Sequence, residues 1–260
     1  MKIKNITSPF FYYDLLITWA YRTIRARYQQ SILGGLWAII VPVAQTVLLS
    51  VIFTYFIPIE TGEIPYIVFS YTAMLPWNLF SSSITDMVDS IVGNMNLVSK
   101  IYFPREILPF SSLLARTVDF LIGFIVLVIL IIFYRIPMTA LWLYLPIILL
   151  IQISLSLGLG LAGAALNVFY RDIRHIFVLG LQIWFYASPI IYPVSAVPTN
   201  LQSIYFLNPM AGVIEAYRAV LLYQQLPNPN LILSACMALV ILTLGYWFFK
   251  KVDKQFADVI

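Results

Sequence analysis

The chain has little charge and almost no cysteine or histidine. Of its 260 residues, 10% are charged and 62% are apolar, whereas a soluble domain is typically about a quarter charged and half apolar. One globule cannot bury so many apolar side chains, so we expect lipid to solvate part of the surface. Cys236 and His175 are the single residues of their types, which excludes an intramolecular disulfide and a cluster of thiolate or imidazole metal ligands.

Motifs for catalysis and nucleotide binding are also absent. No glycine is followed by Lys-Ser or Lys-Thr, and neither HExxH nor GxSxG occurs. The net charge of +4 is too small and too dispersed for a nucleic-acid footprint. We therefore expect a non-enzyme that binds no cofactor, metal or nucleic acid. Asp14 interrupts the first apolar stretch and no small-residue cleavage pattern follows, so the N-terminus is expected to be retained.

Long apolar runs are what the chain does contain. A bilayer core about 30 Å thick needs roughly 20 residues of helix. Five runs meet this requirement: residues 36–57, 117–134, 141–168, 176–192 and 231–249. A sixth run, residues 66–92, is weaker because it carries Pro76, three serines at 81–83 and both Asp86 and Asp89. A re-entrant or interfacial segment is the alternative for this run.

The distribution of basic residues favours six transmembrane helices with both termini in the cytoplasm. If residues 66–92 cross the membrane, all 15 Lys and Arg residues except Arg135 and Arg218 lie on the cytoplasmic side, as the positive-inside rule requires. If they do not cross, Lys100, Arg105 and Arg116 move outside. The prediction is an all-α, multi-pass integral membrane protein with a single transmembrane domain over residues 1–260.

The segment before the first predicted span is amphipathic. A polar stripe at helical spacing predicts an amphipathic helix on the membrane surface over residues 11–30; it consists of Asp14, Thr18, Arg22, Arg25 and Gln29. Arg27 does not fit that stripe. Gly34-Gly35 then permits a sharp turn into the bilayer.

Two loops are long: a cytoplasmic one at residues 93–116 and an external one at 193–230. The external loop is apolar enough to re-enter the outer leaflet. Within it, residues 207–222 are predicted to be helical after Asn208-Pro209, with Glu215 and Arg218 as a possible ion pair at i,i+3.

Several residues allow two interpretations. Asp119 and Arg116 fit an ion pair at a cytoplasmic helix end, and Asp86 with Asp89 fit either a polar path or the end of an interfacial helix. Small residues recur every four positions in the span 141–168, which lets helices approach closely; whether the partner helix belongs to the same chain stays open. They are Ser154, Gly158 and Ala162, and Ser156, Gly160 and Ala164.

Aromatic residues make up 16% of the chain. Those near span ends fit an interfacial belt. The alternative is a channel lining on which sugar rings stack, for which the candidates are Trp37, Tyr55, Tyr66 and Tyr71.

Four blocks of sequence, in order, resemble the ABC-2-type permeases that export polysaccharides. They are residues 27–37, residues 96–109, residues 167–175 with 188–193, and residues 207–218. The likeness is greatest to the O-antigen subgroup, with capsule and teichoic-acid permeases next. It implies a homodimer in the inner (plasma) membrane, with two ATPase subunits that hydrolyse ATP and an undecaprenyl-linked polysaccharide as substrate.

The resemblance also implies roles for particular residues. Residues 11–33, with Arg22, Arg25 and Arg27, would be a gating or interface helix. The cytoplasmic loop 93–116 would couple to the ATPase through Phe103, Pro104, Arg105 and Glu106, with Arg171 and Asp172 as a second contact. External re-entrant segments, including Glu215 and Arg218, would close the far end of the channel. Export of a small amphiphile or drug is the competing function. An ion- or proton-coupled carrier is disfavoured because intramembrane charge is scarce.

Overall fold

The protein is all-helical. The computed structural model describes residues 9–29, 31–100 and 103–256, and no strand occurs among them, which confirms the predicted all-α class. The helices are α1 (Pro9–Tyr28), α2 (Trp37–Val51), α3 (Tyr66–Ser90), α4 (Met95–Val98), α5 (Ile107–Phe133), α6 (Leu145–Phe169), α7 (Ile173–Tyr186), α8 (Thr199–Tyr205), α9 (Pro209–Leu221) and α10 (Asn230–Val252). Short helical turns extend α2 through Ile52–Phe56 and α10 through Asp253–Gln255.

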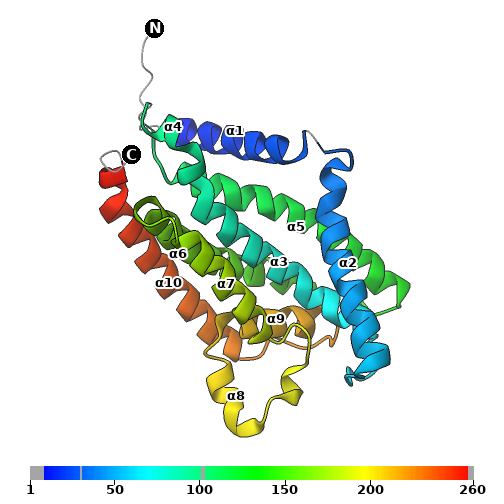
Figure 1. Ribbon diagram of the computed structural model, residues 1–260. Helices are drawn as coiled ribbons and strands as arrows, with labels where there is room; N and C mark the ends of the chain where they lie inside the picture. The colour runs from blue at the N-terminus through cyan, green and yellow to red at the C-terminus, as the bar shows by residue number, and fades with distance from the viewer. Residues whose placement is uncertain (1–8, 30, 101–102, 257–260) are drawn as a thin grey trace.

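The bundle has two distinct ends (Figure 1). Helix α1 lies crosswise over one of them, beside α4 and the last turns of α10, and we call this the α1 end. Helix α2 leaves α1 through the turn at Gly34, whose φ of 51° needs glycine, as the Gly34-Gly35 pair predicted. Helices α2, α3, α5, α6, α7 and α10 run between the α1 end and the opposite, α8 end, where α9 also packs.

Four helical segments of the described chain are long and apolar enough to cross a membrane: Gly34–Phe56, Ile107–Phe133, Ala140–Phe169 and Asn230–Gln255. Each matches one predicted span. The two other predicted spans also form helices, α3 and α7, but α7 is short and α3 falls outside these criteria, so the count of six stays a prediction. Helix α7 ends at Tyr186 and not at residue 192, because proline at 189 restricts Ser188 and cannot donate to a helix.

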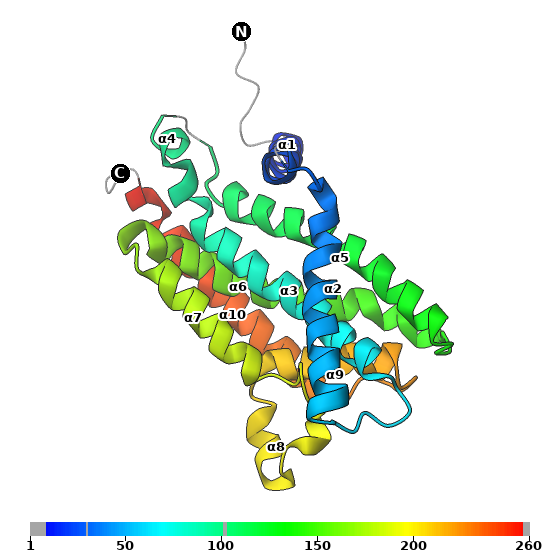
Figure 2. The ribbon, with the colours of Figure 1, turned by 45° about the vertical axis from the view of Figure 1, so that its right-hand side comes forward.

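The weakest of the six predicted spans proves to be the most enclosed of them. Figure 2 shows α3 between α2 and α7, and α3 also packs against α5, α6 and α9. Phe69, Tyr71 and Phe80 on α3 are each at most 1% exposed. Several of its Ser and Thr hydroxyls donate to the helix's own carbonyls, as Thr72 does to Val68 at 2.8 Å. Because protein and not lipid surrounds most of α3, the helix tolerates polar residues that weaken a hydropathy signal.

The small-residue stripes of α6 are used within this chain. At Gly158, an added Cβ would lie 2.5 Å from the backbone of Ile241 on α10, and one at Gly245 would lie 2.1 Å from the Gly158 oxygen. The second stripe faces α3, where a Cβ at Gly160 would meet Met87 at 2.5 Å. Close helix approach of this kind maximises van der Waals contact where lipid gives no hydrophobic driving force.

Candidate functional site

Helix α3 carries a polar face along one side. Its residues at i, i+3, i+4, i+7 and i+8 lie on one face of a helix: Asn78, Ser81, Ser82, Thr85 and Asp86. This face borders a hollow of about 520 Å³ between α2, α3 and α7 and a smaller one of about 260 Å³ between α1, α2, α3 and α5. Both hollows share Asn78, Ser82 and Arg116. We call the two adjoining hollows the polar groove.

The walls of the polar groove combine side-chain amides and aromatic rings. Gln45 of α2 accepts a 3.2 Å hydrogen bond from the Asn78 amide, and Gln182 of α7 lies on the opposite wall. Trp77 and Phe185 meet edge to face at 5.8 Å between ring centroids, next to Tyr186. Amides bond hydroxyl groups while aromatic faces contact apolar C–H surfaces, so the groove suits a ligand that offers both.

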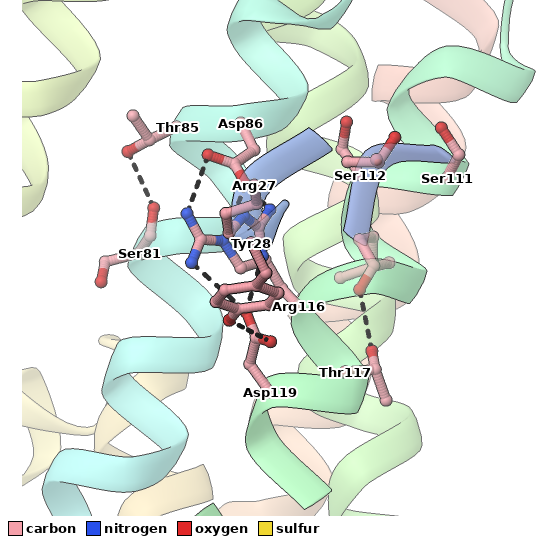
Figure 3. A network of polar contacts seen from close by, with 12 residues as sticks. Arg27, Tyr28, Ser81, Thr85, Asp86, Ser111, Ser112, Arg116, Thr117 and Asp119 are labelled. Atoms are coloured by element: carbon pink, nitrogen blue, oxygen red, sulfur yellow. Dashed lines mark hydrogen bonds and ion pairs between the residues drawn. The ribbon is translucent and has the colours of Figure 1, made fainter. Parts of the chain in front are cut away.

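Four charged side chains form a compact cluster at the α1 end of the groove (Figure 3). Arg27 of α1 donates to Asp119 of α5 and to Asp86 of α3, each at 2.6 Å. Arg116 of α5 donates to both oxygens of Asp86, at 2.7 and 3.1 Å, and to Asp119 at 3.4 Å. The two cations and two anions balance, and their side chains are 13–26% exposed. We call Arg27, Asp86, Arg116 and Asp119 the four-charge cluster.

Tyr28 completes this cluster from the last turn of α1. Its hydroxyl donates to Asp119 Oδ1 at 2.8 Å. Burial raises the pKa of the Tyr28 phenol, and the hydrogen bond to Asp119 raises it further. The hydroxyl therefore remains a donor at neutral pH.

The cluster explains the one arginine that did not fit the polar stripe of α1. Arg27 turns inward to α3 and α5, whereas Arg22 and Arg25 are exposed. The Arg22 guanidinium lies 4.4 Å from the Trp19 ring centroid, on the same helix. The predicted pair of Arg116 and Asp119 is confirmed. Its wider network was missed because Arg27 lies 59 residues from Asp86 in sequence.

The predicted coupling residues of the loop 93–116 lie at the α1 end, but other parts of the same chain bury or half-bury their side chains. Phe103 is 8% exposed and stacks on Trp19 of α1, with 6.4 Å between ring centroids. Glu106 is 6% exposed and accepts a 2.6 Å bond from Lys250. Pro104 and Arg105 are half-buried.

The turn between α6 and α7 presents the second predicted contact. Arg171 and Asp172 are both exposed there, at the same end of the molecule. Their exposure leaves them available to a partner.

The four predicted channel aromatics do not share one surface. Trp37 and Tyr55 on the α2 segment are 45% and 78% exposed, and Trp37 lines the smaller hollow. Tyr66 and Tyr71 are at most 6% exposed, and their hydroxyls donate to the carbonyls of Ile191 and Gly123. Of these four aromatics, Trp37 and Tyr55 alone offer a ring face to a ligand in this conformation.

The sequence analysis did not identify polar groove residues such as Asn78. The helical spacing of polar residues along α3 is the signal that could have identified them.

The predicted ion pair of Glu215 and Arg218 is confirmed, at 3.2 Å within α9, while its external location stays a prediction. Arg218 is fully buried; it also donates to the Ile190 carbonyl at 3.0 Å and lies 3.6 Å from the centroid of the Phe69 ring. A buried guanidinium needs such partners to offset its desolvation. It joins α9 to α3 and to the turn after α7.

Asn208 connects two of the sequence blocks that resemble the permease family, residues 188–193 and residues 207–218. Its side chain accepts from the Met210 amide at 3.0 Å, which caps α9, and from the Trp184 indole at 2.7 Å. It donates to Ser188 Oγ at 2.9 Å. The predicted helix after Asn208-Pro209 is thus confirmed as α9, while its re-entry into the outer leaflet stays a prediction.

No group of three or more metal-ligating side chains occurs in the part of the chain that the structure describes.

The sequence profile of the ABC-2 type transporter family matches residues 14–222. The chain is 27% identical to an O-antigen export system permease protein of Klebsiella pneumoniae over the full length of both chains. It is 29% identical to one of Myxococcus xanthus, covering 99% of this chain and 100% of that one. A polysialic acid transport protein of Escherichia coli is 25% identical over 76% of this chain and 77% of its own.

Proposed function

This chain belongs to the ABC-2 type transporter family, and from that premise we propose that it is the permease of an exporter for O-antigen-type polysaccharide. Relatives that match it over their whole length carry the name of O-antigen export permease. Capsular polysaccharide is the nearest alternative polymer, since the next relatives are polysialic acid transport proteins.

The observation that carries the proposal is the polar groove. A polymer must slide, so many weak contacts along a path serve it better than one tight pocket. Amides at Gln45, Asn78 and Gln182 and the exposed ring of Tyr186 provide such contacts along α2, α3 and α7. A small-molecule exporter would instead enclose most of its ligand, whereas both hollows here are open at the surface.

We propose that two copies of the chain bring their polar grooves together to form a channel. Helix α2 supports this because its outer face is apolar and unpacked in the single chain, with Leu48 and Tyr55 both more than 60% exposed. Trp37 and Tyr55 would then line or border the path. In this proposal α2, α3, α5, α6, α7 and α10 all cross the inner membrane, α1 lies on its cytoplasmic surface, and both termini are cytoplasmic.

ATP would be hydrolysed by a separate ATPase subunit, two per dimer, because the sequence lacks a P-loop. The exposed turn at Arg171 and Asp172 and the half-buried Pro104 and Arg105 are the proposed contacts with it. The substrate would be an undecaprenyl-linked glycan, and α9 with Glu215 and Arg218 would close the outer end. The whole chain would act as one transmembrane domain.

The test compares surface polysaccharide in cells with and without the permease gene, complemented by the wild-type chain, together with sensitivity to amphiphilic drugs. We expect deletion to abolish surface glycan and complementation to restore it, with drug sensitivity unchanged. Unchanged glycan with increased drug sensitivity would reject the proposal and support a small-amphiphile exporter.

A further inference from the structure

We propose that the C-terminal end of α10 and the turn after it, residues 250–256, form a brace for the coupling segment, residues 103–106. In this account Lys250 is the positioning residue through which movement of that segment reaches α10. The inference rests on the proposed function, because it assumes that the coupling segment receives force from an ATPase.

The first observation is an ion pair between the two segments, formed by a buried carboxylate and a lysine whose side chain is 36% exposed. Lys250 Nζ lies 2.6 Å from Glu106 Oε1, across 144 residues of sequence, and 3.8 Å from Asp253. Glu106 is 6% exposed, and its second oxygen, Oε2, has no hydrogen-bond partner among the described residues. Lys250 is therefore the main counter-charge of an enclosed carboxylate.

The second observation is that Arg105 contacts the turn that follows the same end of α10. Its guanidinium donates to the Asp253 carbonyl and lies 5.7 Å from the centroid of the Phe256 ring. Phe256 is fully buried and packs on Phe249 and Phe169, at 5.6 and 6.0 Å between centroids. Two neighbouring residues of the coupling segment thus bond to one short stretch of chain, by separate interactions.

The third observation is what α10 is attached to. The backbones of α10 and α6 are in contact at Gly158 and Gly245. We therefore expect the two helices to move together as a rigid unit. The opposite side of the coupling segment rests on α1, where Phe103 stacks on Trp19. The segment therefore lies between the helix that carries Arg27 and the α6–α10 pair. A push on residues 103–106 would reach both.

The test uses the permease assembled with its ATPase subunit and reconstituted in lipid vesicles. The main variant is the double substitution Glu106→Gln with Lys250→Met, which removes both charges and leaves no unpaired buried ion, so folding should be retained. The control is Lys251→Met on the next residue, whose exposed ammonium lies 5.0 Å from the Trp247 ring centroid. Three quantities are measured: bound ATPase subunit, rate of ATP hydrolysis, and glycan exported per ATP.

We expect the double variant to bind the ATPase subunit and hydrolyse ATP as the wild type does, while glycan exported per ATP falls about 3- to 30-fold, the range typical of residues in coupling networks. The Lys251→Met control should export normally. Normal export per ATP by the double variant would overturn the brace and leave the proposed function intact, and so would an equal loss in both variants. Absence of glycan export by the wild-type complex would instead reject the proposed function.

Discussion

Substitution of Arg27 by methionine should release the end of α1 from the bundle. Arg27 donates two bonds of 2.6 Å to carboxylates on α3 and α5, and each hydrogen bond to a charged group contributes about 1.5–3 kcal/mol. The Arg27 side chain is 22% exposed, so water and the shared cation Arg116 recover part of this loss. We expect local opening of the α1 end to become easier by about 2–4 kcal/mol, or about 30- to 700-fold.

Amide hydrogen exchange on the purified permease measures this opening directly. Exchange should accelerate by that factor in the last two turns of α1, and hardly at all in α3, which the rest of the bundle encloses. Arg25→Met is the matched control, since Arg25 is exposed on the same turn of the same helix. Equal exchange in the two variants would refute the idea that the four-charge cluster fixes α1.

Two further predictions concern packing and topology. Gly245→Ala should destabilise the permease by at least about 2 kcal/mol, because the added Cβ would lie 2.1 Å from the Gly158 oxygen. Gly180→Ala is the control, since nothing lies within 4 Å of a Cβ at that position. Thermal unfolding in detergent compares the two variants, and equal unfolding midpoints would contradict the packing of α6 on α10. In a cysteine-free background, Ser99→Cys should label only from the cytoplasmic side and Ser195→Cys only from outside; labelling of both from one side would reject six spans.

The sequence predicted most elements because their signals are local. Four apolar runs became helices that meet the length and hydropathy of a membrane span. Asn208-Pro209 marked the start of α9, since an asparagine cap followed by proline is a local pattern. Glu215 and Arg218 could be paired from i,i+3 spacing alone.

What could not be predicted depends on contacts between distant segments. The burial of α3 follows from its neighbours, and the polar face that weakened its hydropathy became the floor of the groove. Tyr66 and Tyr71 seemed equivalent to Trp37 in sequence, yet packing against other helices buried them. Glu106 lies between Pro104 and Pro109 in a segment predicted to contact the ATPase, yet it is buried against Lys250, which is near the other end of the chain.

Blocking the polar groove tests the central claim most directly. Ser82 lines both hollows and Gln225 is exposed on the loop after α9, outside them. With Cys236 replaced by serine, Ser82→Cys and Gln225→Cys permeases are reconstituted with the ATPase subunit, treated with a bulky charged thiol reagent, and assayed for glycan export at matched labelling. If the polysaccharide passes along this groove, modification at position 82 should stop export and modification at position 225 should leave it unchanged. Full export by the completely modified Ser82→Cys permease would contradict the account.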